Sequence, residues 1–365
     1  MSSIKDVARL ANVSTATVSH VINNTRFVSD EVRARVEKAI EECRYYPNAH
    51  ARSLASGRSR MIGLVISDIA NPFFPELVKS IEAAAFERGY DVVLSNTNYD
   101  TERTSHYVRR FIERKVAGVA VMTSEMDKTL VEELAHREVP TVFLDVGEVG
   151  RHMNNLRVDY ETGIEQAIRH LFALGHRRIA YVSGSNHLRS SRRRLEAFRK
   201  SLRQLIPEAP EIVFYGNFRV DGGRQAAREL IESHRASMPT AIVCVNDLTA
   251  IGAINEFEAG GFEVPRDLSV IGFDDIAFAA VTKPALTTVH LPLGELGRQA
   301  VDVLLNSLED LSREGVEIRI ATELVVRGST AEAPVTGDAK GKKAVQSNKQ
   351  SNERGENFGE KQAGI

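Results

Sequence analysis

The side chains with the clearest chemical role lie near the N-terminus, in the segment IKDVARLANVSTATVSHVIN at residues 4–23. Apolar residues recur there at helical spacing on both sides of an Ala-Asn-Val turn, and Ser14 has the type and position of an N-cap. The residues between them are small, so the second helix could lie deep in a DNA major groove with its first turn against base edges. An ordinary helical hairpin would share the pattern. The candidate DNA contacts are Ser14, Thr15, Ala16, Thr17, Ser19, His20 and Asn23.

The charge of the first sixty residues is consistent with this prediction. The whole chain has 365 residues and a formal net charge of −2, so it is not a polycation. Residues 1–60 nevertheless hold ten Lys and Arg against six Asp and Glu, a local excess of 10 − 6 = +4. That excess is suited to phosphate contact, although a solvated helical surface could look the same.

Cysteine content and hydropathy exclude several classes of protein. Cys43 and Cys244 are the two cysteines, and neither has a neighbour at metal-ligand spacing. We expect both to be small buried residues and expect no metal or other cofactor. No apolar run approaches the length of a membrane span, and the first residues lead directly into a helix rather than a signal peptide. We therefore expect a cytoplasmic protein with no membrane contact.

Further along the chain the pattern changes from helices alone to alternating strands and helices. Residues 29–43 predict a third helix, and residues 47–59 read as a polar linker with a helical centre. From Met61 onward, short apolar strands alternate with amphipathic helices, which is typical of parallel sheets covered on both faces. The predicted strands are residues 62–67, 91–95, 118–122, 141–145, 178–183, 212–215, 241–245 and 269–273. The predicted helices are residues 74–88, 101–115, 127–137, 160–174, 193–205, 221–232, 248–259 and 293–308.

Eight such units are more than one open sheet holds comfortably, so two α/β lobes are expected. The predicted fold is an all-α helix-turn-helix domain followed by a two-lobed α/β domain with parallel sheets. Residues beyond 330 are rich in Gly, Lys, Gln, Asn and Glu and should be disordered. The expected domains are 1–46 for DNA binding, 47–60 for the linker, 61–330 for the two lobes and 331–365 for the tail.

Several motifs resemble the lactose-repressor (LacI/GalR) family of bacterial transcription regulators. They are IKDVARLANVSTATVSHVIN, YYPNAHARSLA, SDIANPFF, GHRRIAYVSG, PTAIVCVNDLTAIGA and VPRDLSVIGFDD followed by PALTTVHLP, in family order from Ile4 to about Thr330. The DNA-binding segment, including VINNTRFVSDEVR, is closest to the purine-repressor branch. His20 stands where many members carry a guanine-reading arginine, and an imidazole offers less than that bidentate contact.

The resemblance implies a regulator that binds a palindromic operator as a homodimer. Residues 48–56 would be a hinge helix that orders on DNA and enters the minor groove, where Leu54 wedges between base pairs. Ala51 would permit close helix approach and Arg52 would meet a phosphate. A plain linker remains the alternative. The tail lacks the leucine heptads of tetrameric members, which favours a dimer.

The resemblance also implies two lobes like those of periplasmic sugar-binding proteins, with an effector in the cleft at the carboxyl ends of the strands. Arg194 matches the ligand-gripping arginine of the family, and flat aromatic rings beside polar groups suit a sugar. Leu188 falls where purine-binding members place a base-reading arginine, so we favour a sugar or related metabolite over a purine. The candidate effector contacts are Phe73, Phe74, Asp145, Ser190, Arg194, Phe218, Asn246 and Asp274.

The sequence also bears on three other functions. A regulator that uses a partner protein, as in the catabolite-control branch, stays open. A transport receptor without a DNA role would need a signal peptide. An enzyme is not expected, because no Gly-x-Gly-x-x-Gly turn follows a strand and no Ser/His/Asp set lies in a nucleophile turn.

Overall fold

The N-terminal part of the chain is a three-helix bundle. The computed structural model describes residues 2–46, 59–123, 126–145, 149–235, 237–310 and 312–334. Val7, Val18 and Val36, one from each helix, are fully buried against one another. These apolar stripes fix the mutual angle of the helices and leave the first turn of the second helix exposed. The helices are α1 (Ile4–Leu10), α2 (Thr15–Asn23) and α3 (Asp30–Cys43).

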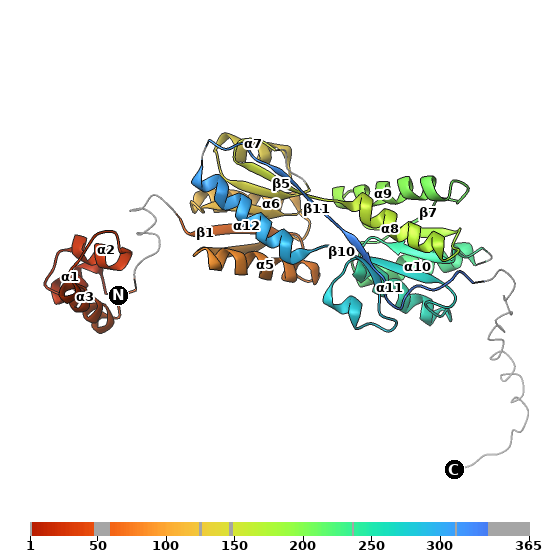
Figure 1. Ribbon diagram of the computed structural model, residues 1–365, viewed down its shortest axis with the longest axis horizontal. Helices are drawn as coiled ribbons and strands as arrows, with labels where there is room; N and C mark the ends of the chain where they lie inside the picture. Colours follow the sequence, from red (N-terminus) through yellow and green to blue (C-terminus); the bar gives the residue numbers. More distant parts are fainter. Residues whose placement is uncertain are drawn as a thin grey trace, which may run out of the picture.

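The rest of the described chain forms two lobes, each a six-stranded sheet between layers of helices (Figure 1). In the N-terminal lobe the strand order is β11-β5-β4-β3-β1-β2, and all its pairs are parallel. Its elements are β1 (Met61–Ile66), α5 (Phe73–Glu87), β2 (Asp91–Asn96), α6 (Thr101–Glu113), β3 (Gly118–Met122), α7 (Lys128–His136), β4 (Thr141–Leu144), β5 (Met153–Val158), α12 (Leu293–Glu309) and β11 (Glu317–Ile320).

The C-terminal lobe repeats this plan with the order β12-β10-β9-β8-β6-β7, in which only the β10–β12 pair is antiparallel. Its elements are α8 (Tyr160–Ala173), β6 (Ile179–Ser183), α9 (Arg189–Leu205), β7 (Ile212–Tyr215), α10 (Val220–His234), β8 (Ala241–Cys244), α11 (Asp247–Ala259), β9 (Ser269–Asp274), η1 (Ala277–Ala280), β10 (Thr287–His290) and β12 (Glu323–Val325).

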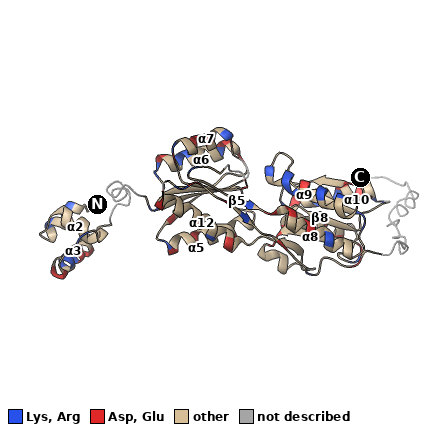
Figure 2. Ribbon diagram, turned by 45° about the horizontal axis from the view of Figure 1, so that its top comes forward, with Lys and Arg blue, Asp and Glu red and all other residues tan. Residues whose placement is uncertain are grey.

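The chain crosses between the lobes three times, after β5, after β10 and after β11 (Figure 1). Because of these crossings, the carboxyl ends of the parallel strands in both lobes face one cleft, where open α/β sheets bind ligands. Figure 2 shows that Lys and Arg positions alternate with Asp and Glu positions along the helices of both lobes. Within the described ranges, no helix is both long and apolar enough to cross a membrane.

The predicted fold class is confirmed, with some differences in the elements. The predicted helix at 193–205 begins at Arg189, four residues earlier. The strands β5, β10, β11 and β12 were not predicted. The strand β5 carries two buried polar residues, Asn154 and Asn155, which weaken the apolar pattern that marks an internal strand. The predicted hinge helix at residues 48–56 lies outside the described residues.

Candidate functional site

The predicted DNA-contacting residues lie at the start of α2 and along its length. Ser14 is the N-cap, and its Oγ accepts a hydrogen bond from the Thr17 amide at 3.0 Å and lies 2.9 Å from Thr17 Oγ1. Thr15 and Ala16 follow in the first turn with exposed side chains. The cap leaves the first turn of α2 open to an outside partner, as direct reading of a base edge requires.

Three other candidates in α2 have intramolecular partners. His20 Nδ1 lies 2.8 Å from Thr25 Oγ1, a contact that holds the imidazole ring in one orientation. Asn23 Nδ2 donates to the Ser19 carbonyl at 3.0 Å and lies 3.2 Å from Ser19 Oγ. Base contacts by Ser19 or Asn23 would compete with these bonds, whereas His20 would keep Nε2 for a base. The other candidates, Ala51, Arg52 and Leu54, lie outside the described residues.

The second site is a cavity between the two lobes at the carboxyl ends of their strands. It brings together seven of the eight predicted effector residues, namely Phe73, Phe74, Asp145, Ser190, Arg194, Phe218 and Asp274. The volume is about 60 Å³, well below the roughly 300–1,000 Å³ of a typical ligand pocket. The two lobes are therefore close together over the site. The remaining lining residues are Ser67, Asn71, Tyr99, Met122, Leu144, Val158, Tyr160 and Leu291.

A buried ion pair forms the polar centre of the cavity wall. Arg194 on α9 points Nη2 at Asp274 Oδ1 at 3.2 Å and donates from Nη1 to the Val245 carbonyl. The guanidinium carbon lies 4.2 Å from the ring centre of Phe273 and 4.9 Å from that of Tyr160, so aromatic faces hold the cation in place. Burial raises the pKa of the Asp274 carboxyl to about 6, and Arg194 opposes that rise.

Asp145, at the end of β4, ties the N-terminal lobe to the C-terminal one. Its oxygens accept from the Tyr160 hydroxyl at 2.6 Å, the Val158 amide at 2.9 Å and Arg193 Nη1 at 2.9 Å. Tyr160 is the first residue of α8 and Arg193 lies in the second turn of α9, and both helices belong to the C-terminal lobe. Burial raises the pKa of this carboxyl, while the hydroxyl and the guanidinium hold it down. A ligand that bonded to Asp145 would act on both lobes at once.

Asn246 is the one predicted effector residue that does not line the cavity. It is the N-cap of α11, where its Oδ1 accepts from the Thr249 amide at 3.0 Å. Its Nδ2 donates to the Phe218 carbonyl at 3.0 Å. Because both ends of the amide are engaged, Asn246 holds Phe218 in position rather than facing the cavity.

The sequence interpretation did not include Tyr99 and Tyr160 among the effector contacts. Tyr99 follows β2 and Tyr160 follows β5, and both face the cavity. The rule that ligands bind at the carboxyl ends of parallel strands would have found Tyr99. Predicting Tyr160 as a contact would have required recognising β5 as a strand, and the polar residues of β5 hide its strand pattern.

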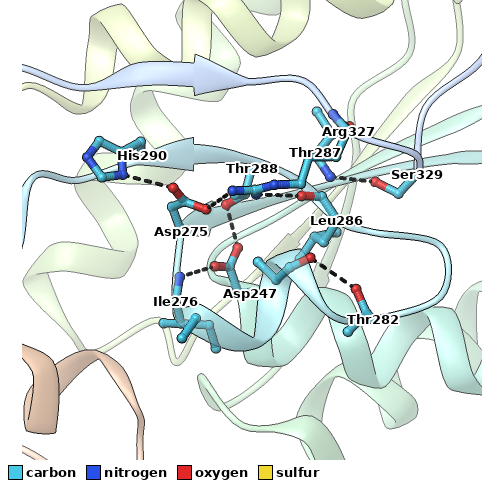
Figure 3. A network of polar contacts seen from close by, with 12 residues as sticks. Asp247, Asp275, Ile276, Thr282, Leu286, Thr287, Thr288, His290, Arg327 and Ser329 are labelled. Carbon is cyan, nitrogen blue, oxygen red and sulfur yellow. Dashed lines mark hydrogen bonds and ion pairs between the residues drawn. The ribbon is translucent and has the colours of Figure 1, made fainter.

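A polar network anchors the strand end that carries Asp274 (Figure 3). Asp275 accepts from Arg327 Nη2 at 2.6 Å and lies 2.9 Å from His290 Nδ1. Asp247 accepts from the Thr288 hydroxyl and from the Ile276 amide at 2.8 Å, and burial raises the pKa of its carboxyl. His290 is the last residue of β10, directly before the second crossing. The network therefore connects the floor of the cavity to an interlobe connection.

The fold and the cavity define a two-lobed α/β ligand-binding protein that carries a DNA-binding helix. Residues 168–330 match the periplasmic binding protein-like domain, and residues 3–48 match the bacterial regulatory proteins of the lacI family. The repressor PurR of Aliivibrio salmonicida is 36% identical over 90% of this chain and 99% of its own length. PurR of Vibrio cholerae serotype O1 is also 36% identical, over 90% of this chain and 97% of its own.

Solved structures agree with these relatives. A lac repressor dimer bound to operator and the anti-inducer ONPF has a TM-score of 0.81 at 30% identity, covering 90% of this chain and 99% of that one. A ribose-bound regulator from Enterococcus faecium has a TM-score of 0.67 at 30% identity, covering 74% and 99%. The chain belongs to the lacI family of bacterial regulatory proteins, and it is a DNA-binding transcription regulator.

Proposed function

We propose that this protein is a repressor that binds a palindromic operator as a homodimer and responds to a small molecule held between its lobes. The proposal rests on one observation. The same chain carries an exposed first turn on α2 and a buried ion pair in the cavity between its lobes. A ligand that changes the lobe arrangement can change how the two heads of a dimer are spaced.

A mostly apolar groove, lined by residues of both lobes, supports the proposal of a homodimer. It is lined in part by Ala70, Pro72, Val220, Leu248, Ile251, Phe278 and Val281, with a volume of about 700 Å³. Phe278 is 56% exposed and Val281 is 72% exposed, which is unusual for side chains grouped in one groove. The lac repressor structure with a TM-score of 0.81 is that of a dimer. A second copy of the chain is therefore the proposed occupant of the groove.

Residues 48–56 are the proposed hinge helix. Leu54→Ala removes the apolar wedge, so affinity for operator DNA selected from a random library should fall by about ten- to hundredfold, as the loss of one buried leucine implies. DNA bending should fall with it. Fluorescence anisotropy and permuted gel shifts measure the two quantities. Phe86→Ala, at an exposed residue of the N-terminal lobe, is the matched control. Unchanged affinity and bending in Leu54→Ala would rule out the wedge.

For the effector, we propose a sugar or a related polyol. Asp145, Asp274 and Arg194 can pair with hydroxyl groups, and the rings of Phe73, Phe74 and Phe218 can cover an apolar sugar face. Leu188 is buried in the apolar core, so this position supplies no cation to a base. Similar solved structures include one with ribose and a regulator CelR with cellobiose, the latter 31% identical with a TM-score of 0.65, covering 90% of this chain and all of that one.

A purine is the second candidate, because the curated relatives at 36% identity are named PurR. Titration calorimetry with ribose, cellobiose, hypoxanthine and guanine, with and without operator DNA, separates the two classes. A polyol effector predicts heat only with the sugars, and a purine effector predicts heat only with the bases. The change in operator affinity gives the sign of the coupling, because linkage makes it reciprocal. A cavity that binds none of these compounds would oppose both assignments.

A further inference from the structure

Two loops from opposite lobes meet across the mouth of the cavity. Asn98 and Tyr99 belong to the loop after β2, and Phe218 and Arg219 belong to the loop after β7. The rings of Tyr99 and Phe218 lie 6.3 Å apart between centres and within 20° of parallel. Both rings line the cavity, so this contact forms part of its boundary with solvent.

An ion pair reinforces the contact between the rings. Arg219 Nη2 lies 2.8 Å from Asp68 Oδ2 and 3.2 Å from Asn98 Oδ1, both in the N-terminal lobe. The Asp68 side chain is only 7% exposed, whereas that of Arg219 is 48% exposed. One guanidinium thus bonds to two segments of the opposite lobe, so parting the lobes must break both contacts.

The backbone at this contact is unusual in both lobes. Asn98, Tyr99 and Phe218 have φ angles of 55°, 61° and 65°, in the left-handed region that non-glycine residues rarely adopt. On the C-terminal side, Phe218 is held by the hydrogen bond from Asn246 to its carbonyl. Its ring also needs Gly184, because a Cβ there would lie 2.2 Å from Phe218 Cε2. Such conformations persist where the surroundings enforce them, commonly at ligand clamps.

We propose that Tyr99, Phe218 and Arg219, with Asp68 and Asn98, form a clasp that shuts the mouth of the cavity and thereby controls the entry and release of the effector. The inference rests on the proposed function of the cavity. With the clasp closed, the cavity of about 60 Å³ is smaller than a typical ligand pocket, so an effector enters only when the lobes part. Closing then replaces water at the mouth with two aromatic rings, and the ion pair sets how long the mouth stays shut.

The clasp can be tested without knowing the effector. The chain contains no tryptophan, so Tyr99→Trp places a single indole in the clasp. In this background the emission should be that of a shielded indole, and adding Arg219→Ala should shift it to longer wavelength. Arg219→Lys, which keeps the charge but not the forked geometry, should give an intermediate shift. Small-angle scattering of the native-tyrosine chain with Arg219→Ala should show a larger radius of gyration.

Arg228→Ala is the matched control, because Arg228 pairs with Glu256 inside one lobe at a similar exposure of 53%. It should change neither emission nor radius. Red-shifted emission from the Tyr99→Trp parent would overturn the clasp proposal, because it would mean that the indole is exposed to solvent. So would an Arg219→Ala variant that matches the Arg228→Ala control in both emission and radius of gyration. For a ligand found by calorimetry, Arg219→Ala should speed release by about two- to fivefold, the range for a partly exposed ion pair. If no compound binds, the proposed function fails while the emission result still decides on the clasp.

Discussion

At the scale of single residues, the cavity depends on charges that are buried in pairs. Removing one member of such a pair leaves the buried charge of its partner unpaired, which typically lowers the free energy of unfolding by about 3–5 kcal/mol. Arg194 and Asp274 are 8% and 4% exposed, so neither charge is screened by solvent. An effector that bonded to Asp274 would therefore alter an interaction that the fold relies on.

The raised pKa of Asp274 predicts a pH-dependent stability. Between about pH 4 and pH 6, the folded chain keeps a proton on this carboxyl that the unfolded chain has lost. The free energy of unfolding contributed by Asp274 therefore falls as the pH rises through this window, by the order of 1–3 kcal/mol. Asp274→Asn removes that slope, so the stability difference, wild type minus variant, should decrease from pH 4 to pH 7.

Urea unfolding at several pH values measures this difference. Asp302→Asn, which changes an exposed carboxyl on α12, is the control, and its difference from wild type should not follow the same curve. If the difference in free energy of unfolding between the wild type and Asp274→Asn stays constant from pH 4 to pH 7, the raised pKa of Asp274 is contradicted.

At the scale of elements, the close packing of α5 on α12 joins the first and last helices of the N-terminal lobe. Gly297 on α12 allows this approach, because a Cβ there would lie 2.3 Å from Ser80 Oγ and 2.6 Å from Ser80 Cβ. The Ser80 hydroxyl in turn donates to the Gly294 carbonyl at 3.0 Å. The chain reaches α12 directly from the cavity floor, so this contact positions the interlobe crossing.

Gly297→Ala should destabilise the protein by about 1–3 kcal/mol, because the added methyl group forces the two helices apart. Adding Ser80→Gly, which removes the two nearest opposing atoms, should recover part of that loss. Gly294→Ala is the matched control, since the nearest atom to its Cβ is 4.0 Å away. Thermal unfolding measures all three variants. Equal effects of the two alanine substitutions would argue against close packing at Gly297.

The sequence predicted the elements where local pattern determines structure, and failed where distant contacts do. Most helices and the apolar strands β1, β3, β6, β8 and β9 follow from periodicity. The strand β5 was missed because Asn154 is satisfied by remote partners, the Thr141 carbonyl and Ser307 Oγ. The start of α9 was missed because Arg189 and the residues after it show no apolar repeat.

The same distinction applies to the candidate site. Seven effector residues were found because motif position and strand ends indicate where side chains converge. Asn246 has the right location, but its amide is used for capping α11, which only the surrounding hydrogen bonds reveal. The contact between Tyr99 and Phe218 joins residues far apart in the chain and depends on how the lobes meet.

At the scale of the whole molecule, function depends on how two copies of the chain are arranged. One helix-turn-helix reads one half-site, so operator affinity depends on joining two heads at fixed spacing. The apolar groove around Phe278 and Val281 is the proposed contact between the two copies, and a closed two-fold dimer would use the same groove on each of them. Asp68 and Arg219 of the clasp also line this groove, so lobe movement would change its shape.

Val281→Glu should therefore weaken the dimer, since burying a carboxylate in an apolar interface costs several kcal/mol. Sedimentation equilibrium should show a larger fraction of monomer at micromolar concentration, and affinity for a two-half-site operator should fall while the folding of each protomer is kept. Tyr215→Glu, at an exposed residue of the edge strand β7, is the control and should leave the association state unchanged. A Val281→Glu variant that sediments as wild type would show that the second copy binds elsewhere. A monomeric variant that kept full operator affinity would instead show that the heads act independently of the lobes, against the coupling on which the proposed control by an effector depends.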